Sequence, residues 1–126
     1  MRCVCFIASM ALATGAFACD WPIRSLAEND RVSDAVFIAA VTGRKSTNTI
    51  ELEVVDLFKG SLTGRVEIPT VSDCDFFVDP SIRKGERFLV FLTRTERGLH
   101  VGLGGGTARF VEGNADIQYI RAKYRK

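Results

Sequence analysis

The chain has 126 residues, of which 47% are hydrophobic and 25% are charged, and its formal net charge is +2 at pH 7. This length is enough for one domain with a hydrophobic core but not for two. A charge so close to zero gives no strong attraction to nucleic acid or to an anionic membrane surface, so we expect neither as a partner.

Residues 1–18 predict a secretory signal peptide. A short positive start is followed by an almost entirely apolar stretch at residues 4–12, and the segment contains no acidic residue. Ala16 and Ala18 occupy the two small-residue positions that precede a signal cleavage site. The apolar stretch is too short for a membrane-spanning helix. We therefore expect a secreted or periplasmic protein.

Cleavage there leaves residues 19–126 as one mature domain that begins at Cys19. Cys3 and Cys5 are lost with the signal, so Cys74 is the one remaining thiol with which Cys19 could pair. In an oxidising compartment we expect a disulfide between them, and the alternative is two separate buried thiols. Acylation of Cys19, which would give a lipid-anchored form, is a second alternative. Two cysteines and one histidine do not make a zinc site, and we expect no cofactor.

The first elements of the mature chain are a helix and a strand. Ser25 and Glu28 have the spacing of a capping box, which predicts a short helix that reaches about Asp30. The β-rich residues 35–41 predict the first strand. We expect this strand to end in the polar stretch at residues 43–48.

Two more strands follow. Residues 50–57 begin with strict alternation of apolar residues and glutamates, as in a strand with one solvent-exposed face. The phase of this alternation changes at Val55, which predicts a bulge. Residues 64–68 alternate in the same way, and we expect Pro69 to end that strand because it has no amide to donate.

The second half of the chain contains two further strands. Residues 87–92 are almost continuously apolar, which predicts a strand buried on both faces and therefore a second element that covers it. Residues 99–103 predict a fifth strand in which His100 faces solvent, with no Ser, Cys or Asp spaced to suggest a catalytic triad. The glycine run at residues 102–106 lacks the lysine of a phosphate-binding loop, so we expect a close approach of another backbone segment there.

Asn114 is placed to cap a final helix, residues 115–124, which has one apolar stripe formed by Ile117, Ile120 and Tyr124. We expect the basic residues at its end to be solvated and favoured by the helix dipole. Together the elements predict an all-β fold with flanking helices: a five-stranded Greek-key OB-like barrel with one N-terminal and one C-terminal helix. No nucleophile is paired with a base, so we expect no enzymatic activity.

Several motifs occur in the order found in a known family. They are the N-terminal Cys19, the strand Asp34–Val41, the element Leu57–Gly60, Cys74, and the strand Gly85–Phe91. In this order the chain resembles the netrin-like module of tissue inhibitors of metalloproteinases, and especially its short bacterial relatives. The resemblance extends from residue 19 to about residue 107.

This resemblance implies inhibition of a zinc metalloendopeptidase by a monomeric domain. The α-amine and carbonyl oxygen of Cys19 would chelate the zinc of the partner protease, and Asp20 would enter the adjacent substrate pocket. The partner-binding residues are then expected to be Cys19, Asp20, Trp21 and Cys74. Trp21 stands where the family usually has a second cysteine. The alternative is a non-inhibitory extracellular or cell-envelope protein-interaction module on the same barrel.

Overall fold

The structure, a computed structural model, describes residues 24–70, 72–96, 98–102 and 105–125. The elements in chain order are α1 (Leu26–Val32), β1 (Ala35–Ser46), β2 (Thr49–Lys59), β3 (Arg65–Pro69), η2 (Phe76–Val78), β4 (Arg87–Thr95), β5 (Gly98–His100), β6 (Ala108–Arg109) and α2 (Ala115–Tyr124). The expected signal peptide and its cleavage site lie outside these residues.

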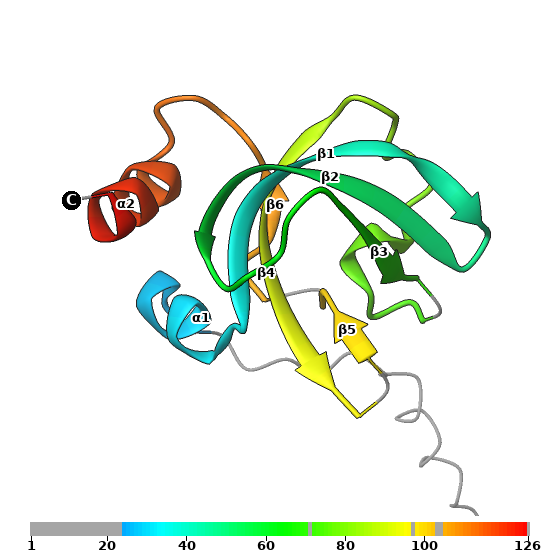
Figure 1. Cartoon of the computed structure of the whole chain (residues 1–126), viewed down its shortest axis with the longest axis horizontal. Helices are drawn as coiled ribbons and strands as arrows, with labels where there is room; N and C mark the ends of the chain where they lie inside the picture. The colour runs from blue at the N-terminus through cyan, green and yellow to red at the C-terminus, as the bar shows by residue number, and fades with distance from the viewer. Residues whose placement is uncertain (1–23, 71, 97, 103–104, 126) are drawn as a thin grey trace, which may run out of the picture.

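The strands form one antiparallel sheet that curls into a half-barrel (Figure 1). The strand order is β3-β2-β1-β4-β5, and β6 pairs separately with β4. The curl brings β3 into contact with β5. The prediction of a mostly antiparallel β fold with one helix near each end is confirmed. The short strand β6 was not predicted, because two exposed residues give no alternation to detect.

The hairpin of β1 and β2 is longer than predicted. β1 does not end before residue 43 but continues to Ser46, which pairs with Thr49 across the turn. The polar side chains of this stretch are mostly exposed, and β2 supplies the backbone hydrogen bonds. Pairing with β2 therefore keeps these residues extended, although their own preference for a strand is weak.

The predicted bulge at Val55 is confirmed. The β1–β2 register shifts between the pairs Ile38–Asp56 and Ala39–Val54, which leaves Val55 as the extra residue on β2. A bulge changes which face of the sheet the following side chains reach. Val55 itself is exposed. Before it the even-numbered Ile50 and Leu52 lie in one core, whereas beyond it the odd-numbered Leu57 packs against that core and Phe58 lies in the core on the opposite face.

Strand β4 separates two hydrophobic cores, which confirms that it is buried on both faces. Its residues 88, 90 and 92 face the concave side of the sheet, in a core with Phe37, Ile50, Leu52, Ile68 and Phe77. Its residues 89 and 91 face the convex side, in a core with Val36, Ile38, Phe58, Ile117 and Ile120. The two helices cover this convex side, as Figure 1 shows.

Both helices begin at the predicted caps. The Ser25 hydroxyl accepts a hydrogen bond of 3.2 Å from the Glu28 amide, and α1 then continues two residues beyond the predicted end. The Asn114 side chain accepts a bond of 2.7 Å from the amide of residue 116. Ile117 and Ile120 are buried, so the predicted apolar stripe of α2 is confirmed.

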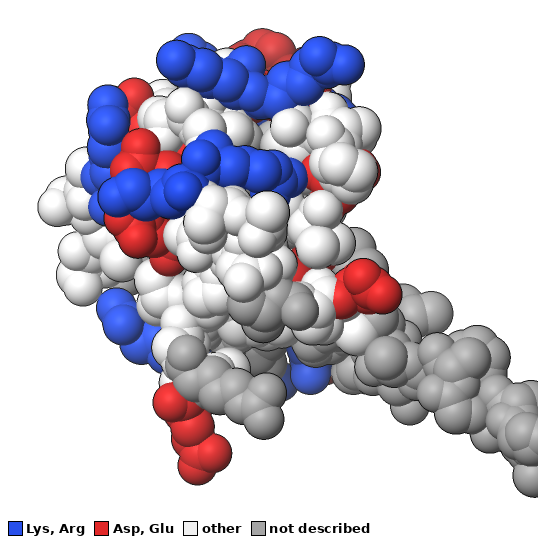
Figure 2. All heavy atoms as spheres, turned by 90° about the vertical axis from the view of Figure 1, so that its right-hand side faces the viewer, with Lys and Arg blue, Asp and Glu red and all other residues white. Residues whose placement is uncertain are grey.

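The edge strand β3 carries charges that are paired across the sheet. Lys45 lies 2.9 Å from Glu67, and Arg65 lies 3.4 Å from Glu51. Figure 2 views the molecule from the hairpin side and shows Lys and Arg side chains there, with Asp and Glu among them. Such exposed pairs add little to stability, but charges together with Pro69 discourage another strand from pairing with this edge.

Gly106 shows a close approach in the glycine run, but to side chains and not to the backbone segment that was predicted. Its φ is +99°, and an added Cβ would lie 2.9 Å from Asn29 Nδ2 and 3.0 Å from Phe91 Cδ2. The adjacent Thr107 hydroxyl accepts a hydrogen bond of 2.9 Å from the Phe91 amide. Gly106 and Thr107 therefore pack against α1 and β4.

Candidate functional site beside Cys74

Cys74 is the one predicted partner-binding residue that the structure describes. Cys19, Asp20 and Trp21 lie outside the described residues. Cys74 is partly buried, and it is not a free thiol. Its pairing with Cys19 remains a prediction.

A compact turn holds Cys74 in place. The Ser72 hydroxyl accepts a hydrogen bond of 2.9 Å from the Cys74 amide. The Asp75 carboxylate in turn accepts one of 3.0 Å from the Ser72 amide, and the Asp75 amide donates to the Ser72 carbonyl oxygen at 3.0 Å. Side-chain oxygens that bond to nearby amides in this way favour a turn over a strand. The backbone on both sides of Cys74 is therefore fixed.

The expectation that His100 is only a solvated strand residue is wrong. Its Nδ1 lies 3.1 Å from Oδ1 of Asp75, and the two side chains are 29% and 7% exposed. The neighbouring backbone supports this contact, because the Phe76 amide donates to the Val101 carbonyl oxygen at 2.8 Å. Asp75 also forms an isolated bridge with Gly102. The curl of the sheet, which brings β5 to the Cys74 segment, produces this pairing.

Three phenylalanines anchor the same segment to the concave core. Phe76, Phe77 and Phe88 contact one another edge to face, with ring centroids 5.0, 5.6 and 5.3 Å apart. Phe77 is fully buried, and Phe76 is partly exposed. Edge-to-face ring pairs add about 0.5–1.5 kcal/mol each beyond burial alone. Packing and hydrogen bonds therefore both hold the Cys74 segment against the sheet.

A half-open pocket of about 330 Å³ lies next to this segment. We call it the Phe76 pocket, and its lining residues are Asp75, Phe76, Val78, Asp79, Ile82, Phe88 and Arg109. Four of them are apolar and three are charged. The sequence gives no sign of this pocket, because Arg109 joins its lining through the unpredicted strand β6.

Charged side chains at the pocket already have partners. Arg109 forms an ion pair with Glu86, and its guanidinium lies 5.4 Å from the centroid of the Phe88 ring. Asp79 accepts a hydrogen bond of 2.9 Å from the Ser81 amide. This backbone bond, a bond from the Ser81 side chain and the nearby arginines hold the pKa of Asp79 below its ordinary value. Asp79 is therefore ionised at neutral pH.

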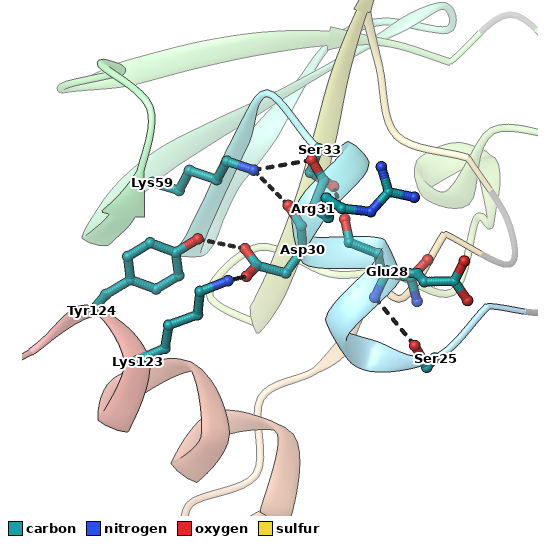
Figure 3. Close-up of polar contacts among 9 residues, drawn as sticks. Ser25, Glu28, Asp30, Arg31, Ser33, Lys59, Lys123 and Tyr124 are labelled. Carbon is teal, nitrogen blue, oxygen red and sulfur yellow. Dashed lines mark hydrogen bonds and ion pairs between the residues drawn. The ribbon is translucent and has the colours of Figure 1, made fainter.

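A second polar cluster, at Asp30, joins the two helices (Figure 3). The Asp30 side chain is fully buried, and its carboxylate accepts a hydrogen bond of 2.6 Å from the Tyr124 hydroxyl and pairs with Lys123. Burial raises the pKa of Asp30, but the bonds from Lys123 and Tyr124 and the charges of Lys123 and Lys59 outweigh it, so the pKa lies below the ordinary value.

The prediction for the basic C-terminal residues was therefore incomplete. Lys123 binds the buried Asp30, and Arg125 pairs with Asp56 of β2. These side chains are about half exposed, as expected, but they also connect α2 to the rest of the fold.

The Phe58-Lys59-Gly60 element, one of the motifs in the family resemblance, has a structural role. Phe58 is buried in the convex core. The Lys59 ammonium donates to the backbone carbonyl oxygens of Asp30 at 2.6 Å and Arg31 at 3.3 Å, at the C-terminal end of α1, where a cation is favourable. This element fixes the end of β2 to α1.

Within the described residues, no group of three or more His, Cys, Asp or Glu side chains could hold a metal ion. No helix in the described part of the chain is long and apolar enough to cross a membrane. No protein-family model and no curated protein matches the chain.

Proposed function

We propose that residues 19–126 form a secreted or periplasmic, non-enzymatic domain that inhibits a zinc metalloendopeptidase. In this proposal the half-barrel is an OB-like Greek-key barrel of the netrin-like type. The resemblance in motif order supports it, together with an antiparallel sheet flanked by two helices.

The proposed mechanism uses the first residue of the processed chain. The α-amine and carbonyl oxygen of Cys19 would form a five-membered chelate with the zinc of the protease and displace its catalytic water. A free α-amine has a pKa of about 7.7–8.0, and only its neutral form binds metal. Inhibition should therefore release a proton and become tighter as the pH rises through this range.

The rigid setting of Cys74 is the observation that carries the proposal. The Ser72 turn, the Asp75–His100 contact and the edge-to-face phenylalanines all restrain this segment. A disulfide from Cys19 to such a segment would orient the α-amine nitrogen and the carbonyl oxygen of Cys19 before the protease binds. Preorganisation of this kind reduces the conformational entropy lost on binding.

The decisive experiment compares two forms of the exported protein against a panel of zinc endopeptidases. One form begins at Cys19, and the other carries one additional alanine before it. The native form should inhibit, and the extended form should lose inhibition because its α-amine is displaced and acylated. Equal inhibition by both forms, or none by either, would overturn the chelation mechanism. Mass spectrometry of the same samples shows the cleavage site, any acyl group on Cys19 and the oxidation state of the cysteines.

Asp20 provides a second test of the same geometry. Desolvation of an unpaired carboxylate costs several kcal/mol, so Asp20→Ala should strengthen inhibition of a protease whose substrate pocket is apolar. It should weaken inhibition of one whose pocket is basic. An unchanged inhibition profile would place Asp20 outside the interface.

A protein-interaction module that does not contact zinc is the second candidate. The Phe76 pocket beside Cys74 favours it, because an aromatic-lined pocket can receive a partner's side chain without any metal. This candidate predicts a partner whose affinity is the same for the native and the alanine-extended forms.

A further inference from the structure

We propose that the Phe76 pocket binds an aromatic side chain of a protein partner. The proposal uses only residues that the structure describes and is independent of zinc chelation by Cys19. If Cys19 does bind a protease, the pocket supplies a second contact, because its lining residues Asp75 and Phe76 follow Cys74 directly in the chain.

The size and lining of the pocket fit one side chain. Its volume of about 330 Å³ is at the lower limit of the range for small-molecule sites, which is about 300–1,000 Å³. Phe76, Val78, Ile82 and Phe88 give it an apolar lining. Aromatic residues and arginine are enriched at the centre of protein interfaces, and Phe76, Phe88 and Arg109 all line this pocket.

The existing ring geometry favours an aromatic occupant. Phe76 and Phe88 meet edge to face at an interplanar angle of 77°, and Phe76 is partly exposed toward the pocket. A further ring can therefore continue the edge-to-face arrangement that aromatic side chains prefer. The planar guanidinium of Arg109 already lies over Phe88 and can also stack on an incoming ring.

The charges around the pocket argue against a charged occupant. Asp75 contacts His100, Asp79 accepts from Ser81, and Arg109 pairs with Glu86. An incoming carboxylate would meet Asp75 and Asp79, and an incoming cation would meet Arg109, so either would lose hydration and also face a like charge in the lining. An aromatic ring gains from burial and leaves these pairs intact.

The test titrates the exported protein with N-acetyl-phenylalanine amide and follows the methyl chemical shifts of Val78 and Ile82. N-acetyl-leucine amide and N-acetyl-arginine amide serve as comparison probes. We expect saturable shifts of both residues with the phenylalanine probe and affinities at least about threefold weaker with the other two. Absence of these shifts, or binding of the leucine or arginine probe at least as tight, would overturn the proposal.

Two matched variants locate the binding. Val78→Trp places a ring in the pocket and should weaken binding of the phenylalanine probe at least about tenfold. Val111→Trp makes the same change at a residue that is 58% exposed and does not line the pocket, so it should bind as the wild type does. Equal loss in both variants, or none in either, would place the binding elsewhere. No protease is present, so failure here is distinct from failure of the proposed inhibition.

Discussion

Tyr124→Phe is a minimal test of whether the Asp30 cluster holds the two helices together. The substitution removes one hydroxyl and keeps the aromatic ring, which packs against the convex core. The lost interaction is the 2.6 Å hydrogen bond from the Tyr124 hydroxyl to the buried carboxylate of Asp30. Burial and the hydrogen bond to Asp30 both raise the pKa of Tyr124, so the hydroxyl keeps its proton at neutral pH and can donate.

The expected magnitude follows from the charge and burial of the acceptor. A hydrogen bond to a charged group contributes about 1.5–3 kcal/mol to folding. Asp30 is fully buried in the structure, so water cannot easily replace the lost donor, although Lys123 remains. We therefore expect a loss of about 2 kcal/mol. With an m-value of about 2 kcal/mol/M in urea, the unfolding midpoint should fall by about 1 M.

The effect should depend on pH with a definite sign. The pKa of Asp30 in the folded protein lies below its ordinary value of 3.8, so its ionised form stabilises the fold. This contribution is fully present above the unfolded pKa and is lost as the pH falls through the folded pKa. The difference between Tyr124→Phe and the wild type should therefore be constant from pH 5 to 7 and shrink below about pH 4.

Urea unfolding at several pH values measures both expectations. Tyr119→Phe is the matched control, because Tyr119 lies on the same helix and is 40% exposed. Its loss should be within about 0.5 kcal/mol at every pH. If both variants unfold at the same urea concentration at pH 7, the hydrogen bond from Tyr124 to Asp30 does not stabilise the fold. If the stability difference between Tyr124→Phe and the wild type grows at acid pH, the ionised form of Asp30 does not stabilise the fold.

Three further predictions concern the turn positions and the Cys74 segment. Gly60→Ala should destabilise the protein more than Gly64→Ala. Both glycines have positive φ, but only at Gly60 would the new Cβ meet backbone, at 2.9 Å from the Asp34 carbonyl oxygen. Equal urea midpoints for the two variants would contradict this close approach. Cys74→Ser should lower stability by about 4 kcal/mol if a disulfide closes the loop from residue 19, and a reducing agent should lower the wild type equally but leave the variant unchanged. His100→Ala leaves Asp75 without its imidazole contact and should speed amide hydrogen exchange at residues 72–78 while exchange in α2 stays the same; equal rates in both proteins would show that the contact does not hold the segment.

Features that depend on neighbours in sequence were predicted well. Each of these features depends on residues only a few positions apart: the caps at Ser25 and Asn114, the stripe of α2 and the bulge at Val55. The double burial of β4 followed from a continuous apolar run, since no face was left for solvent. These predictions hold because helix and strand periodicity is a local property.

Contacts between distant segments were missed for the opposite reason. The hydrogen bond from Tyr124 to Asp30 spans 94 residues, and no local pattern distinguishes that aspartate from any other. The His100–Asp75 contact likewise requires the curl of the sheet, which brings β5 to the Cys74 segment. The lining of the Phe76 pocket likewise combines distant segments, because strand β6 places Arg109 beside Phe88. Most of the fold could therefore be predicted from the sequence. Of the site beside Cys74, only Cys74 itself could be predicted.

The two most characteristic motifs of the family resemblance serve packing rather than partner binding. Lys59 caps the end of α1, Gly60 lies against the backbone of residue 34, and residues 88–91 of β4 fill both cores. Because these residues stabilise the half-barrel, they are evidence about the fold and not about the activity. The proposed activity must therefore be judged on the proposed chain terminus at Cys19 and on the surface around Cys74. The alanine extension changes only the first of these and the pocket variant only the second, so together they separate zinc chelation from a metal-independent interaction.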